Sequence, residues 1–198
     1  MTGRIFTPFA IDPFTILPED SPLPEPCGIP IVLGRNGAFG SGEHETTASC
    51  LEILARLPEV RGARGLDLGS GTGILAIAAV RLGADEVVAV DIEWPAAVSC
   101  AANARLNGME DRVLSVCGEL ASLRGGQFDI LLANIYADIH LALADQMVDM
   151  TRPGGLLLLS GIPLQDKFDI QNRFARLGCT QLDMRILEDY VTLLVRKD

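Results

Sequence analysis

One stretch limits what this chain can fold into: Gly65-Leu-Asp-Leu-Gly-Ser-Gly-Thr-Gly-Ile-Leu75. A short apolar run there contains an acid, Asp67, and three glycines follow at alternate positions, Gly69, Gly71 and Gly73. A helical pattern of apolar residues begins directly after the last glycine. We therefore predict a strand, a tight glycine-rich turn and a helix, an arrangement that lets the backbone approach a small ligand closely. Nucleotide-binding folds of several chemistries share such a turn, so the glycines alone do not identify the ligand.

Strand and helix patterns alternate along the chain around this stretch. The predicted strands cover 86–91, 112–117, 128–134 and 156–160, the predicted helices cover 45–57, 94–106, 137–150 and 165–177, and 181–187 and 190–196 form a terminal antiparallel pair. Pro153-Gly-Gly155 is expected to separate a helix from the strand that follows it. This alternation predicts a doubly wound α/β fold, with a mostly parallel sheet, right-handed crossovers and helices on both faces.

Polar residues stand at the ends of four predicted strands. Asp67 belongs to the glycine-rich turn, and Asp91, Glu119 and Asn134 end or directly follow the next three strands. In parallel sheets of this kind, ligands bind beyond the carboxyl ends of the strands. We therefore expect these four side chains to share one binding site.

Two adenosine ligands fit this pattern, a nicotinamide dinucleotide and S-adenosylmethionine (SAM). In either case Asp91 can accept hydrogen bonds from ribose hydroxyls, and Glu119 can reach the adenine amino group. The glycine spacing is GxGxG rather than the GxGxxG usual for dinucleotides. A carboxylate at Asp67 is poorly placed for a pyrophosphate but favours the sulfonium or ammonium group of SAM. The alternative is that Asp67 and Asp91 only cap turns.

Proline is concentrated at the N-terminus. Residues 1–33 contain seven of the eleven prolines, a density that excludes regular helix and favours extended backbone. We therefore divide the chain into a Pro-rich extended segment, 1–33, and one domain, 34–198. Apolar residues interleaved with the prolines indicate that the segment packs along the domain surface. The alternatives are that it docks a partner or is what remains of a larger N-terminal domain.

The charge of the chain restricts the kinds of binding partner, and its cysteine content indicates the cellular compartment. A net charge of −10 disfavours direct nucleic-acid binding and favours a basic protein or a cationic small molecule. Five cysteines without CxxC spacing suit a reducing cytoplasm, and with only two histidines we predict no metal site. No apolar run is long enough to cross a bilayer and no secretory signal is evident. We expect a cytoplasmic protein.

Three blocks carry a resemblance to a known family: Gly37-Ala-Phe-Gly-Ser-Gly-Glu-His-Glu-Thr-Thr47, Gly73-Ile-Leu-Ala-Ile-Ala-Ala79 and Ala133-Asn-Ile135. The glycine-rich turn with Asp91 resembles motif I and its partner acid in class I SAM-dependent methyltransferases. The three blocks together resemble the PrmA family of bacterial ribosomal protein methyltransferases, over about residues 30–198. The resemblance implies a seven-stranded sheet with the last strand inserted antiparallel, SAM as cofactor, and SAM contacts at Thr47, Gly69, Asp91 and Asn134.

The chain departs from the family pattern in three places. Family members carry a separate N-terminal substrate-recognition domain, for which this chain is too short, so we expect the catalytic domain only. The family loop FGTGxHxTT is here Phe39-Gly-Ser-Gly-Glu-His-Glu-Thr-Thr47, and the family's Asn-Ile-Leu becomes Asn134-Ile-Tyr136. Phe39 is expected to cover the cofactor.

The resemblance and the strand-end residues together predict a site and a reaction. The candidate cofactor-binding residues are Thr47, Asp67, Gly69, Gly71, Gly73, Asp91, Glu119 and Asn134, and the catalytic candidates are Asn134 and Tyr136. A carbonyl of Asn134 can accept a hydrogen bond from an incoming amine. Tyr136 either contacts the acceptor, with a cation–π contribution, or is a surface aromatic residue.

We predict methyl transfer from SAM to an amine nitrogen, a lysine or N-terminal amine of a protein, with a ribosomal protein as a possible substrate. Three alternatives stay open. The acceptor can be a small-molecule amine, the chain can bind SAM without transferring a methyl group, or it can be a nicotinamide-dependent oxidoreductase.

Overall fold

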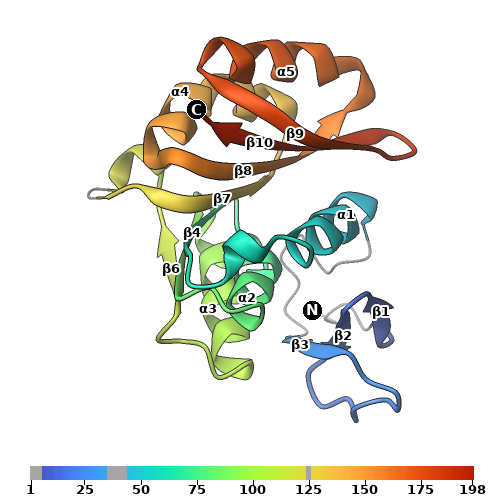
Figure 1. The fold of residues 1–198 in the computed structure, drawn as a ribbon. Coiled ribbons are helices and arrows are strands. Elements are labelled where there is room, and N and C mark those ends of the chain that lie inside the picture. The colour runs from blue at the N-terminus through green and yellow to red at the C-terminus, as the bar shows by residue number, and fades with distance from the viewer. Residues whose placement is uncertain (1–5, 35–43, 124–125) are drawn as a thin grey trace.

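The computed structural model describes residues 6–34, 44–123 and 126–198. Its main element is a seven-stranded sheet with the order β6-β5-β4-β7-β8-β10-β9 (Figure 1). The strands are β4 (Arg64–Leu68), β5 (Glu86–Asp91), β6 (Val113–Cys117), β7 (Phe128–Asn134), β8 (Thr151–Pro163), β9 (Cys179–Ile186) and β10 (Tyr190–Lys197). Strands β6, β5, β4, β7 and β8 pair in parallel, and β10 pairs antiparallel with both β8 and β9. The predicted sheet, with its last strand inserted antiparallel, is therefore confirmed.

Helices cover both faces of this sheet. They are α1 (Glu45–Leu54), α2 (Ile74–Arg81), α3 (Trp94–Leu106), α4 (Ala137–Met150) and α5 (Lys167–Arg176), with short 3-10 turns at η1 (Pro58–Val60), η2 (Leu120–Ser122) and η3 (Leu164–Asp166). Helices α1, α2 and α3 lie on one side of the sheet, and α4 and α5 lie on the other (Figure 1). This is the doubly wound arrangement that the alternation predicts.

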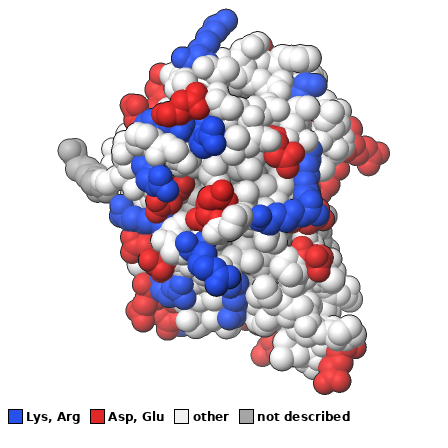
Figure 2. Space-filling model, viewed as in Figure 1, with Lys and Arg blue, Asp and Glu red and all other residues white. Residues whose placement is uncertain are grey.

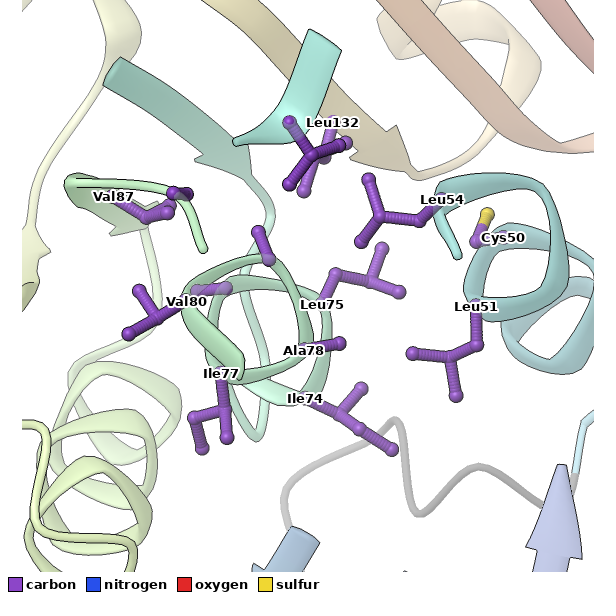
Figure 3. Packing of buried hydrophobic residues seen from close by; sticks show 14 of the residues in the cluster. Cys50, Leu51, Leu54, Ile74, Leu75, Ile77, Ala78, Val80, Val87 and Leu132 are labelled. Carbon is purple, nitrogen blue, oxygen red and sulfur yellow. The ribbon is translucent and has the colours of Figure 1, made fainter. Parts of the chain in front are cut away.

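Alternate residues of each central strand feed the two hydrophobic layers. In β7, Leu132 belongs to the layer beneath α1, α2 and α3, whereas Leu131 and Ala133 belong to the layer beneath α4 and α5. This follows from the two-residue period of a strand. The close view in Figure 3 shows Leu54 of α1 and Leu75 of α2 pointing into the space between the two helices. Because both faces are buried, β7 is apolar throughout its middle, as expected of a parallel strand.

Most predicted boundaries lie within three residues of the observed ones, and the largest difference is at the start of β8. The strand predicted over 156–160 is β8, which already begins at Thr151 and therefore includes Pro153-Gly-Gly155. The pairing of β7 with β8 shifts between Phe128 and Ile130, so these residues form a bulge rather than a break. Gly154 has φ 75°, a conformation that glycine adopts readily and that lets the chain bend at the bulge. A proline is tolerated in a strand at such a bulge.

The N-terminal residues form a second, smaller sheet. Its strands are β1 (Phe9–Ile11), β2 (Phe14–Pro18) and β3 (Ile29–Leu33), with β1 antiparallel and β3 parallel to β2. Apolar side chains of this sheet, including Phe14 and Ile31, are buried in the same core layer as α1 and α2. The segment thus packs on the rest of the chain through a sheet of its own. A domain boundary at residue 34 stays a prediction.

Candidate functional site

A cavity of about 670 Å³ lies at the carboxyl ends of β4, β5 and β7. Its walls come from the glycine-rich turn, the ends of these strands, the first turns of α1, α3 and α4, and the start of β10. The volume lies in the range usual for small-molecule sites. Among the described residues that line it, three are acids and none is Lys or Arg.

The glycine-rich turn shapes one wall of the cavity. Gly69, Gly71 and Gly73 all have positive φ, at 70°, 53° and 77°, a region that side chains rarely adopt. A Cβ atom on Gly69 would lie 2.4 Å from Cγ2 of Ile135, and one on Gly73 would lie 2.5 Å from the sulfur of Cys100. Glycine is therefore required at both positions by conformation and by space. Gly73 is also the N-cap of α2.

Asp91 holds the turn from the end of β5. One carboxylate oxygen accepts a hydrogen bond from the N–H of Gly71 at 2.9 Å, and the other accepts one from the N–H of Glu93 at 3.0 Å. Asp91 therefore caps the turn. A carboxylate can accept about four hydrogen bonds, so two acceptor positions remain for hydroxyl groups in the cavity that Asp91 lines. Capping and ligand binding are compatible at this residue.

Asp67 is buried at the base of the same cavity. One of its oxygens accepts a hydrogen bond from the N–H of Ala76 in α2 at 3.1 Å, and its exposed fraction is 2%. Burial raises the pKa of Asp67 to about 7; the hydrogen bond from Ala76 opposes this rise, and the nearby Asp91 charge adds to it. The carboxyl is thus poised between its two protonation states near neutral pH. A cation in the cavity would favour the ionised form.

Asn134, at the end of β7, is oriented by α1. Its side-chain Nδ2 donates a hydrogen bond to Oγ1 of Thr47 at 3.2 Å, and Thr47 is buried in the first turn of the helix. With the NH₂ group directed at Thr47, Oδ1 is the remaining acceptor of the amide. Asn134 and Thr47 both line the cavity. A Cβ on Gly161 would lie 3.1 Å from this Oδ1, so a glycine on β8 leaves the space beside it.

The other predicted site residues lie in different surroundings. Tyr136 is the N-cap of α4 and lines the cavity with 74% of its surface exposed. Glu119 is an exposed residue at the start of η2, outside the residues that line the cavity, and its contact with adenine stays a prediction. Phe39 and most of the block Gly37–Thr47 fall in 35–43, outside the described residues.

Tyr190 is an aromatic cavity residue that sequence reasoning missed. Its ring meets the ring of His44 edge to face, with centroids 5.2 Å apart, and both residues line the cavity. The carboxylate of Glu45 accepts hydrogen bonds from the N–H groups of Glu188 and Asp189 at 3.1 and 3.3 Å, which ties the β9–β10 turn to α1. Tyr190 stands outside every motif, and only the antiparallel insertion of β10 brings it to the cavity.

Neither a metal centre nor a membrane span is found in the described part of the chain. No three His, Cys, Asp or Glu side chains of residues 6–34, 44–123 and 126–198 gather in a way that would hold a metal ion. No helix in these ranges combines the length and apolarity needed to cross a membrane.

The fold and the cavity together define a class. A seven-stranded sheet with β10 reversed, a glycine-rich turn after β4 and an acid at the end of β5 are the features of class I SAM-dependent methyltransferases. Residues 2–198 match the family model described as ribosomal protein L11 methyltransferase (PrmA). The chain belongs to the PrmA family. The match includes the Pro-rich segment as well as the three blocks that carry the resemblance.

Curated relatives agree with this family. The chain is 40% identical over 177 residues to the ribosomal protein L11 methyltransferase of Syntrophotalea carbinolica, covering 88% of this chain and 57% of the relative. It is 42% identical over 170 residues to the protein of the same name from Pelobacter propionicus, covering 84% of this chain and 54% of the relative. The chain thus spans a little over half the length of these relatives.

Solved structures agree on the fold. A crystal structure of the ribosomal protein L11 methylase from Lactobacillus delbrueckii subsp. bulgaricus superposes with a TM-score of 0.86 at 30% identity, covering 98% of this chain and 100% of that chain. The Thermus thermophilus 16S rRNA N2 G1207 methyltransferase, solved with AdoMet and guanosine, gives a TM-score of 0.67 at 25% identity, covering 81% of this chain and 45% of that chain.

Proposed function

We propose that this chain transfers a methyl group from SAM to an amine nitrogen of a protein, with ribosomal protein L11 as the first substrate to test. Membership of the PrmA family supports the reaction. The observation that carries the proposal is the convergence of Asp67, Asp91 and Asn134 on one cavity beside the glycine-rich turn. We also place the protein in the cytoplasm, because its five cysteines are all free thiols.

The chemistry of the cavity fits SAM better than a dinucleotide. SAM supplies a methyl group activated on a sulfonium, and it carries an ammonium group and two ribose hydroxyls. The buried acid Asp67 suits the cationic end, and the free acceptor positions of Asp91 suit the ribose. The three acids of the described lining would repel the charges of a pyrophosphate, and no Lys or Arg of that lining offsets them.

The residues on the acceptor side suit a neutral amine. Oδ1 of Asn134 can accept a hydrogen bond from an amine N–H, which turns the nitrogen lone pair toward the reacting carbon. Transfer forms the nitrogen–carbon bond as the sulfur–carbon bond breaks, and the amine then loses a proton to solvent. The protein contributes alignment, worth about 7–11 kcal/mol in favourable cases. Tyr136 and Tyr190, which line the same cavity, offer aromatic faces to the alkylammonium group that the transfer forms.

The surface charge also suits a basic protein substrate. The net charge is −10, and on the face drawn in Figure 2 Lys and Arg lie among Asp and Glu rather than in a separate basic patch. A protein rich in lysine is attracted by such a surface, whereas phosphate backbones need clustered cations. The absence of direct nucleic-acid contact stays a prediction.

The proposal is tested by incubating the purified chain with radiolabelled SAM and purified ribosomal protein L11, and separately with a bacterial lysate. Label on lysine or N-terminal nitrogen of L11, located by mass spectrometry, is the expected result. Label on a small amine only would change the acceptor class. If the chain binds SAM but labels nothing in either mixture, it is a binding protein and the proposed reaction is wrong.

Asp91→Ala is expected to weaken the binding of S-adenosylhomocysteine by about 10- to 100-fold, since each hydrogen bond to a charged group contributes about 1.5–3 kcal/mol. The change removes the ribose acceptor and frees the N–H of Gly71. Isothermal titration calorimetry measures the affinity. Asp85→Ala is the matched control, because this exposed acid precedes the opposite end of β5. Equal affinities in the two variants would exclude Asp91 from the site.

The affinity for SAM is expected to depend on pH through Asp67. Its pKa of about 7 means that the carboxyl takes up a proton as the pH falls below neutral. A protonated carboxyl does not attract a cation, so SAM affinity should fall, by up to about tenfold for each pH unit below the pKa. Titrations between pH 8 and pH 6 measure this slope. Asp67→Asn should bind weakly at pH 8 and lose the slope; a slope that persists in this variant would point to another group.

A further inference from the structure

Asn103 is a buried residue of α3 that joins two separate parts of the backbone. Its exposed fraction is 2%. Its Oδ1 accepts a hydrogen bond from the N–H of Gly34 at 2.8 Å, and its Nδ2 donates one to the carbonyl oxygen of Thr72, also at 2.8 Å. Both distances are those of good hydrogen bonds. One side-chain amide therefore links the residue after β3 to the glycine-rich turn of the cavity.

The turn needs such support because of its composition. Thr72 lies between Gly71 and Gly73, both with positive φ, and glycines lose more conformational freedom on ordering than other residues. Within the turn, the N–H of Gly71 donates a hydrogen bond to Asp91, and the N–H of Gly73 donates one to the carbonyl of Ser70 at 2.7 Å. Asn103 lies outside the residues that line the cavity and holds the carbonyl of Thr72 from behind.

We infer that Asn103 is a positioning residue for the cofactor: it fixes the peptide of Thr72 and so keeps the glycine-rich turn in the shape that binds SAM. The identity of the ligand rests on the proposed function. That Asn103 orders the turn can be tested in the absence of SAM.

Asn107, one helical turn further along α3, provides a matched comparison. It is also buried, with 8% exposed, and its Oδ1 accepts a hydrogen bond from the N–H of Val32 while its Nδ2 donates one to the carbonyl of Val32. Its other hydrogen bonds are with Asn103, Ala104 and Arg81. Asn107 thus anchors β3 to α3 with the same chemistry as Asn103, and its contacts are made away from the turn.

Substitution by aspartate distinguishes the contact of Asn103 with the turn from the contact of Asn107 with β3. Asn103→Asp keeps the acceptor for Gly34 and places an oxygen against the carbonyl of Thr72, so it breaks the contact with the turn selectively. Asn107→Asp makes the same chemical change against Val32. Both variants should lose similar thermal stability. Asn103→Asp alone should weaken S-adenosylhomocysteine binding, by at least about tenfold, because a carboxylate oxygen placed against the carbonyl oxygen of Thr72 repels it and disturbs the turn that holds the ligand.

Amide hydrogen exchange in the ligand-free chain supplies the second readout. Exchange of the Gly71–Gly73 amides should be faster in Asn103→Asp than in Asn107→Asp. If Asn103→Asp does not fold, Asn103→Ser takes its place with the same criteria. Equal affinities and equal exchange in the two variants would make Asn103 a structural residue only. Wild-type chain that fails to bind S-adenosylhomocysteine would overturn the proposed function, and the exchange comparison would still decide whether Asn103 orders the turn.

Discussion

Asn134→Ala is expected to lower the turnover number for methyl transfer by about 100- to 1,000-fold, the range found when an oriented hydrogen-bonding group is removed from a reacting centre. The variant loses Oδ1, the acceptor of the amide whose Nδ2 bonds Thr47, and Asn134 lines the cavity. Turnover is measured with labelled SAM and saturating L11. Binding of S-adenosylhomocysteine, measured by calorimetry, should change far less than turnover, because Asp67 and Asp91 remain.

Thr47→Val is the graded control for this result. The change keeps the volume of the side chain and removes the oxygen that accepts from Nδ2 of Asn134. Turnover should fall by about tenfold, between wild type and Asn134→Ala, since the amide is retained but no longer held. Wild-type turnover in Asn134→Ala would remove this residue from the reacting centre. A loss of ligand binding as large as the loss of turnover would limit it to holding the cofactor.

Gly69→Ala is expected to destabilise the folded chain by about 2–4 kcal/mol and to abolish ligand binding. The first contribution is the positive φ of 70°, which costs a side chain about 1 kcal/mol. The second is the Cβ placed 2.4 Å from Ile135, whose β-branched side chain has little rotamer freedom, so overpacking adds about 1–3 kcal/mol. Because Ile135 follows Asn134, its displacement also disturbs the reacting centre.

Gly62→Ala separates these two contributions. Gly62 has nearly the same φ, 74°, but a Cβ there meets nothing within 4 Å. This variant should lose only about 1 kcal/mol and bind S-adenosylhomocysteine as wild type does. Urea denaturation gives both free energies of unfolding. If the two variants are equally stable, the crowding against Ile135 does not contribute, and the conformation of the glycine alone explains the loss.

The sheet could be predicted because each central strand is recognisable from its own sequence, as an apolar run that ends in a polar residue. The run around Leu131 is apolar on both faces, and Asp91 and Asn134 end their strands with polar side chains, so periodicity and position agree. The family blocks supplied what periodicity lacks, namely the reversed last strand. The SAM contact that they imply at Thr47 stays a prediction. Pro153-Gly-Gly155 misled the prediction of β8, because proline and glycine mark bulges as well as turns.

Long-range contacts set the limit of the sequence prediction. Tyr190 reaches the cavity only because β10 inserts between β8 and β9. Its ring contacts the ring of His44, a residue far away in the sequence. The hydrogen bond from Nδ2 of Asn103 to Thr72 likewise spans separate elements. No local pattern encodes such pairings, since they follow from the topology of the whole sheet. The sequence predicts extended backbone for the Pro-rich segment, whereas the pairing of its strands into a small sheet was not predicted.

The anchoring of β3 by α3 has a further consequence for how the molecule behaves in concentrated solution. An open strand edge is a template on which another chain can add a strand, which leads to aggregation. Here the outward N–H and carbonyl of Val32 are already engaged by the amide of Asn107. At the opposite edge, β1 has only three residues and is too short to recruit a partner. Asn103 likewise accepts a hydrogen bond from the N–H of Gly34, directly after β3. The side chains of Asn103 and Asn107 thus take the place of a neighbouring strand at this edge, and we expect them to oppose the addition of a strand from another molecule.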